Sequence, residues 1–124
     1  MKILVLMMLF GMSLIPGVSV GAEWTSITRD QSGDVDIFVD RESISHVSDA
    51  TVRGWVKYRY SQPKQFDSRF IKELEVYGEY HCTERSYKII RSIAYFADGT
   101  NEPDQSERQG HILRDDVVFE YLCK

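Results

Sequence analysis

The sequence predicts a small exported domain built on an antiparallel β-sheet and closed by one disulfide. Three observations lead to this prediction: a signal-type apolar segment at the start, two central stretches that alternate strictly between apolar and polar residues, and a total of two cysteines. Strict alternation is typical of strands with one face in the core and one in solvent. We therefore expect a sheet that is half-buried along most of its length.

Residues 1–22 have the pattern of a secretory signal peptide. Lys2 gives one positive charge, residues 3–15 form an apolar run, and a Pro-Gly pair ends it. Residues 20–22, Val-Gly-Ala, supply the small residues that signal peptidase recognises, so cleavage is predicted after them. An uncleaved anchor is the alternative, because the segment is just long enough to span a bilayer. The Pro-Gly break and the cleavage pattern favour removal.

Composition limits what the mature domain, residues 23–124, can bind. It has 102 residues, enough for one hydrophobic core, with 14 basic and 19 acidic side chains and hence a formal charge of −5. An acidic chain without a basic cluster is unsuited to nucleic acid or to an anionic membrane surface. Once the signal peptide is removed, no membrane insertion is expected.

The two cysteines, Cys82 and Cys123, are expected to form a disulfide, because cysteines of small exported domains usually pair. The bond would close a loop of about 41 residues, which stabilises the fold by about 4 kcal/mol in the chain-entropy estimate. That amount is a large share of the stability of a small domain.

The first part of the mature domain predicts a hairpin followed by a capped turn. Residues 24–28 and 35–39 have the composition of short strands, and Ser-Gly-Asp at residues 32–34 is turn-forming. Asp40 is placed to cap a single helical turn over residues 41–45.

The middle of the chain predicts a long hairpin with a defined register. Residues 52–60 and 72–82 both alternate, and an antiparallel pairing whose partner numbers sum to 132 matches every outward-facing pair. A shift of one residue would place charges in the core. Each exposed pair contributes only a few tenths of a kcal/mol, so the pairs select the register more than they stabilise the sheet. On this outer face the pairs are Arg53 with Glu79, Trp55 with Tyr77, Lys57 with Glu75, and Arg59 with Glu73.

A third strand, residues 87–97, is expected beside the second one. With partner numbers that sum to about 170, Glu79 would lie beside Arg91 on the outer face. Gly54, Gly78 and Ser92 would then form a row of small residues on the opposite, inner face. Such a row would leave a shallow trough, because nothing projects from the sheet there.

The remaining segments are less regular. Residues 98–110 have no large apolar side chain and several loop-forming residues, so we expect a mobile polar loop, with a functional loop as the alternative. Residues 115–124 fit a helix that begins at the paired Asp115 and Asp116, and equally a strand that begins with two valines. Spacing alone leaves both open.

Four short blocks of the mature domain stand out together: Trp24, Val39-Asp40-x-x-Ser43-Ile44, Glu79-x-x-Cys82-x-x-Arg85 and Cys123. They resemble the surface-adhesin E-like family of small exported bacterial proteins. The resemblance covers nearly all of residues 24–124 and implies an α+β fold. It implies an antiparallel sheet of about six strands, with a C-terminal helix packed on its concave face and tied there by the disulfide. The lipidation cysteine of the adhesin that gives the family its name is absent, so a soluble periplasmic or secreted protein is expected.

The sequence contains no recognisable active site. His46, His81 and His111 lie at no spacing typical of metal ligands. His81 precedes Cys82, but adjacent residues of a strand face opposite ways and this cysteine is expected in the disulfide. No catalytic residue, metal or cofactor is predicted, and the domain is not expected to be an enzyme.

The predicted function is a non-enzymatic binding module for a protein partner that the sequence does not identify. Two surfaces are candidates: Trp55 with Tyr77 on the outer face, and the acidic side chains Glu102, Asp104 and Glu107 of the polar loop. For the aromatic pair, an ordinary cross-strand contact is the alternative. An inhibitor of a periplasmic or secreted enzyme such as a lysozyme is the second functional hypothesis, because an acidic loop suits a basic cleft.

Overall fold

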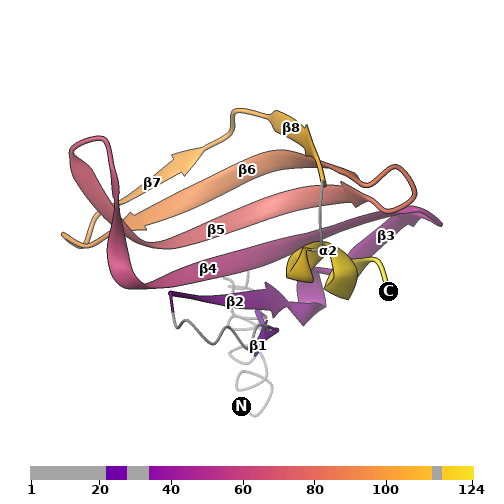
Figure 1. Ribbon diagram of the computed structural model, residues 1–124, viewed down its shortest axis with the longest axis horizontal. Helices are drawn as coiled ribbons and strands as arrows, with labels where there is room; N and C mark the ends of the chain where they lie inside the picture. The colour runs from indigo at the N-terminus through magenta and orange to yellow at the C-terminus, as the bar shows by residue number, and fades with distance from the viewer. Residues whose placement is uncertain (1–21, 28–33, 113–115) are drawn as a thin grey trace, which may run out of the picture.

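The computed structural model describes residues 22–27, 34–112 and 116–124. Within them an antiparallel sheet of eight strands dominates the molecule (Figure 1). Six strands follow one another in the order β1-β2-β4-β5-β6-β7, while β3 pairs with β4 and β8 pairs with β6. The predicted signal peptide and most of the first turn lie outside the described residues. The elements are β1 (Trp24–Ser26), β2 (Val35–Asp40), the 3-10 turn η2 (Arg41–Ser43), β3 (Ser45–Ser48), β4 (Thr51–Phe66), β5 (Arg69–His81), β6 (Ser86–Phe96), β7 (Asn101–Asp104), β8 (Arg108–His111) and α2 (Val117–Leu122).

The predicted register of the β4–β5 hairpin is confirmed. Trp55 faces Tyr77, and both the Arg53–Glu79 and the Arg59–Glu73 pairs form as expected. The last two are ion pairs, with Nε–Oε distances of 2.8 and 2.9 Å. Beyond Arg59 the pairing shifts, and the hairpin continues past the rest of the sheet as a curled tip (Figure 1).

The predicted register of β6 against β5 is wrong. Glu79 faces Lys88, and Arg91 faces Tyr77. The pairing changes just after Tyr77, where β6 contains one extra residue, Ile90, without a partner across the strand. This bulge changes the sum of the partner numbers from 167 to 168, and a second irregularity between Ile71 and Glu73 changes it back. Both sums differ from the predicted 170, so the strand is displaced along its whole length.

The expected trough of small residues is absent for two reasons. Ser92 lies opposite Val76 instead of Gly78. The ring of Tyr80 lies across Gly78, so that a Cβ at this glycine would stand 2.8 Å from the tyrosine hydroxyl oxygen. Tyr80 therefore fills the space that the glycine leaves, and it is only 5% exposed.

Residues 98–110 contain two short strands and are not one continuous loop. The strands β7 and β8 both pair with β6 and form one border of the sheet. A short border strand buries little, so it does not need the alternation by which strands are recognised. Pro103 suits this position, because proline has no N–H to donate to a further strand.

The capped turn after β2 is confirmed, and its hydrogen bonds connect the end of β2 with the start of β1 and with β4. Asp40 is buried, and its Oδ1 accepts hydrogen bonds from the backbone N–H groups of Glu42 and Glu23, at 3.1 and 2.8 Å. The hydroxyl of Ser43 donates to the Asp40 carbonyl and accepts from the Trp55 N–H, each at 2.8 Å. The strand β3 that follows was not predicted, because all its residues are exposed.

The C-terminal segment is a helix, as the resemblance implied. Asp116 is its N-cap, and the carboxylate accepts a hydrogen bond from the Phe119 N–H at 2.9 Å. The Cys82–Cys123 disulfide is present, and it joins the residue that follows β5 to the residue that follows α2. The helix and the sheet share one hydrophobic cluster, whose buried members are Val39, Val52, Val56, Tyr80, Val118, Phe119 and Leu122.

Candidate functional site

The predicted aromatic pair on the outer face is in contact but is not a free surface. The ring centroids of Trp55 and Tyr77 are 5.3 Å apart, and both side chains are half-buried. The guanidinium of Arg91 lies over both rings, 5.6 Å and 5.2 Å from their centroids. A cation in this position shields the aromatic faces that a ligand would otherwise meet.

Ion pairs hold the outer face on both sides of this aromatic pair. On one side Glu79 contacts Arg53 and, at 2.7 Å, His81. The hydrogen bond from His81 is the main reason that the pKa of Glu79 lies below its ordinary value. On the other side Lys57 pairs with Glu75 at 4.0 Å, and its ammonium group lies 4.4 Å from the centroid of the Trp24 ring. The outer face is thus a set of mutually engaged side chains.

The predicted acidic side chains at the β7–β8 border are largely engaged as well. Glu102 pairs with Arg69 at 3.0 Å, and Asp104 pairs with Arg108 at 3.1 Å. The Ser106 N–H also donates to Asp104 at 2.8 Å and lowers the pKa of that carboxyl. Glu107 is exposed in the connection between the two strands. Because two of the three carboxylates have internal partners, they do not form an acidic projection that suits a basic enzyme cleft.

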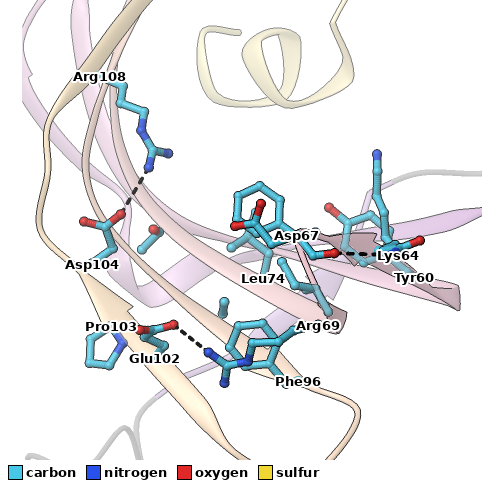
Figure 2. Close-up of a pocket in the computed structure, with 15 residues that line it drawn as sticks. Tyr60, Lys64, Asp67, Arg69, Leu74, Phe96, Glu102, Pro103, Asp104 and Arg108 are labelled. Atoms are coloured by element: carbon cyan, nitrogen blue, oxygen red, sulfur yellow. Dashed lines mark hydrogen bonds and ion pairs between the residues drawn. The ribbon is translucent and has the colours of Figure 1, made fainter.

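The inner face carries a groove that the sequence did not reveal. Two adjoining pockets, of about 640 and 420 Å³, share Tyr60, Leu74, Ser92 and Arg108 and form one depression. Strands β4, β5 and β6 provide its floor, and α2 closes one end through Asp116. The curled hairpin tip and the β7–β8 border form its sides (Figure 2). We call this depression the inner groove, with its floor of Tyr58, Tyr60, Leu74, Val76, Ser92 and Ala94.

The rim of the inner groove carries balanced charge. Three cationic and three anionic side chains line the larger pocket. Both arginines of the rim form ion pairs with the acidic side chains of β7, and these pairs lie on one side of the groove in Figure 2. Arg69 also stacks on the ring of Phe96, with its guanidinium 3.6 Å from the centroid. The charged rim side chains are Lys64, Arg69, Arg108, Asp67, Glu102 and Asp104.

The inner groove also contains a group of tyrosines. Tyr58, Tyr60, Tyr80 and Tyr87 all line its smaller pocket. Burial is the main cause that raises the pKa of Tyr58, Tyr60 and Tyr80, so these phenols remain protonated at neutral pH. The sequence placed three of these residues on the inner face, but alternation alone cannot distinguish a groove from a closed core.

The described residues offer no metal centre and no membrane-spanning helix. Across 22–27, 34–112 and 116–124, no three or more histidine, cysteine, aspartate or glutamate side chains come together as metal ligands would. Every helix in the same ranges is too short or too polar to cross a bilayer. His81 is engaged with Glu79 and with the Ser86 hydroxyl, at 2.7 and 3.0 Å.

These observations define a class: a domain of one open antiparallel sheet of many strands, with a short C-terminal helix and a disulfide that ties the end of this helix to the end of β5. The family model described as surface-adhesin protein E matches residues 24–115. The chain therefore belongs to the surface-adhesin protein E family, and the resemblance seen in the sequence is confirmed.

Solved structures support the same fold. A structure of Haemophilus influenzae protein E in crystal form II is 16% identical in sequence, with a TM-score of 0.54, over 82% of this chain and 96% of that one. A second structure of Haemophilus influenzae protein E is 14% identical, with a TM-score of 0.53, over 85% and 83% of the two chains. No curated protein sequence matches the chain. At this level of identity the structures establish the fold alone.

Proposed function

We propose that the chain is an exported, adhesin-type binding protein that recognises a protein partner and catalyses no reaction. Membership of the surface-adhesin protein E family supports an adhesive role. The predicted signal peptide at residues 1–22, without a lipidation cysteine, supports a soluble protein in the periplasm or outside the cell. The engaged acidic side chains give no support to inhibition of an enzyme, so that alternative is not pursued.

The observation that carries this proposal is the inner groove. An apolar sheet face is normally covered by a second layer, because it gains stability only when water is excluded from it. Here α2 has six residues, and the groove extends beyond it to the hairpin tip. An apolar depression left open in a small domain is typical of an interaction surface.

The outer face is the second candidate surface for the same function. It carries the predicted Trp55 and Tyr77, whose rings are covered by Arg91, and an ion pair of Arg53 with Glu79 lies beside them. A partner on this face would have to displace Arg91. The predicted Glu102 and Asp104 belong to the rim of the inner groove, and Glu107 follows them in the connection to β8. The apolar floor between the rim ion pairs can be reached without replacing them, and we therefore place the main binding surface in the inner groove.

Adhesion of protein-coated beads tests the proposal. Protein exported from expressing cells and purified with its disulfide intact is coupled to beads. Saturable binding is then measured to immobilised protein preparations from bacterial envelopes, culture medium and eukaryotic cell surfaces. We expect saturable binding to at least one preparation and a loss of at least tenfold in the groove variant Ala94→Arg, whose long charged side chain would occupy the groove.

The matched control is the outer-face double variant Trp55→Ala with Tyr77→Ala. Circular dichroism and the intact disulfide establish that both variants are folded. Full binding by the control together with loss in Ala94→Arg supports the inner groove. Full binding by Ala94→Arg together with loss in the outer-face variant would place the binding surface on the outer face. The absence of saturable binding to every preparation would overturn the proposed function.

A further inference from the structure

We infer that the inner groove binds an uncharged, extended peptide segment of the partner, and that its tyrosine hydroxyls donate hydrogen bonds to the peptide's carbonyl oxygens. The inference rests on the proposed function, which it deepens by naming the chemistry of the recognised segment. Three features of the groove carry it: hydroxyl groups without protein partners, a rim of balanced charge, and the spacing of the tyrosines along β4.

The hydroxyl groups are the first feature. Within the described part of the chain, the hydroxyls of Tyr58, Tyr60, Tyr80 and Tyr87 make no hydrogen bond with another protein group. No fully buried side-chain nitrogen or oxygen among the described residues lacks a partner, so each of these hydroxyls is at least partly open to solvent. Tyr80 shows this most clearly, because the residue is only 5% exposed and still lines the smaller pocket. Because these hydroxyls have no protein partner, they are available to donate to a ligand that offers acceptors.

The charge of the groove excludes a strongly charged ligand. The phenols remain protonated at neutral pH, so they can donate hydrogen bonds without adding a charge. Asp116 lies at the helix end of the same pocket and opposes an anion. The arginines at the rim are already paired with Glu102 and Asp104, and they offer no unpaired positive cluster. A neutral ligand is not repelled by Asp116 and does not have to break the ion pairs of the rim.

The positions of the tyrosines fit a peptide backbone. Tyr58 and Tyr60 are two residues apart on one face of β4, which separates them by about 6.6 Å along the strand. An extended peptide presents successive carbonyl oxygens on one side with the same period. Between and beside the tyrosines the floor is apolar, with Leu74, Val76 and Ala94, and it suits the small or apolar side chains of such a segment.

Peptide selection followed by affinity measurement tests the inference. Exported, oxidised protein is used to select from a library of random twelve-residue peptides. Binding of the selected peptides, synthesised with both ends capped, is measured by isothermal titration calorimetry. We expect the selected peptides to be uncharged or balanced in charge. We expect Tyr58→Phe and Tyr60→Phe each to lower the affinity about fivefold, because each removes one hydrogen bond while keeping the ring.

The matched control is Tyr95→Phe, which removes a hydroxyl on the outer face that donates to Glu75 at 3.2 Å. This variant should bind the peptides as the unchanged protein does. Selection of charged peptides, equal affinity of the groove variants, or binding of neutral glycans in place of peptides would each overturn the inference. The proposed function would survive these results if Ala94→Arg still abolished adhesion. It would fail separately if no adhesion occurred at all.

Discussion

At the scale of single residues, glycines on the inner face have different surroundings although they look alike in the sequence. Gly54 has no atom closer than 3.7 Å to the place of a Cβ. Gly78 lies under the ring of Tyr80, whose hydroxyl oxygen is 2.8 Å from that place. Tyr80 belongs to the main hydrophobic cluster with α2, so it cannot move aside without disturbing the helix. The space above Gly78 is therefore needed by the fold.

Replacement of these two glycines should have opposite effects on stability. We expect Gly78→Ala to lower the free energy of unfolding by about 2 kcal/mol, because the added methyl group overpacks a closed site. We expect Gly54→Ala to raise it by about 0.5 kcal/mol, because alanine fits there and restricts the unfolded chain. Urea unfolding of both variants measures the difference. Equal effects at the two positions would show that the Tyr80 contact is not as described.

Glu79 should give the stability of the domain a defined dependence on pH. Its hydrogen bond with His81 and its pairing with Arg53 favour the ionised carboxylate, so its pKa in the folded protein lies below the ordinary value of 4.5. The stabilising contribution is then complete above pH 4.5 and is lost as the pH falls through the lowered pKa.

Chemical unfolding at pH 7 and at stepwise lower pH values tests this expectation. The unchanged protein should exceed Glu79→Gln in stability at pH 7, and the difference should shrink progressively below pH 4.5. A difference that stayed constant, or grew on acidification, would contradict the described role of the carboxylate. Glu120→Gln is a suitable control, because Glu120 is exposed on α2.

At the scale of elements, the disulfide and α2 depend on each other. The helix has six residues, and a helix of this length has little stability alone. Its N-cap at Asp116 and the bond from Cys123 to Cys82 fix its two ends. Between these ends, Val118, Phe119 and Leu122 complete the hydrophobic cluster of the sheet.

Removal of both cysteines should therefore cost much of the stability. For a bond that joins positions 41 residues apart, we expect Cys82→Ala with Cys123→Ala to lower the free energy of unfolding by about 4 kcal/mol. Urea denaturation followed by tyrosine and tryptophan fluorescence measures the change. A loss below about 1 kcal/mol would show that the cluster holds α2 without the covalent link.

The strands also show what can and cannot be predicted from the sequence. The β4–β5 register was predictable, because complementary charges on one face specify a single alignment. The β5–β6 register was not, because β6 does not alternate strictly between polar and apolar residues and therefore does not specify one alignment. The two register shifts along this pair depend on backbone geometry. The border strands β7 and β8 were missed because they bury too little to alternate.

At the scale of the whole molecule, the inner groove lies where the apolar face of β4, β5 and β6 continues beyond the hydrophobic cluster that the sheet shares with α2. The sequence indicated the apolar inner face but not how far α2 would extend across it, so a closed core and an open groove looked the same. The outer face, which the sequence suggested as the interaction surface, is occupied by its own ion pairs and by Arg91 over the aromatic pair. Recognition is therefore expected on the face that the fold leaves open.

Fluorine NMR of protein labelled with 3-fluorotyrosine tests this central claim most directly. The chain has seven tyrosines, and single Tyr→Phe variants assign their signals. On addition of a bound partner or selected peptide, the account predicts shifts for Tyr58, Tyr60, Tyr80 and Tyr87 in the inner groove. The signals of Tyr77 and Tyr95 on the outer face should stay in place. Shifts confined to these two outer-face tyrosines would contradict the account.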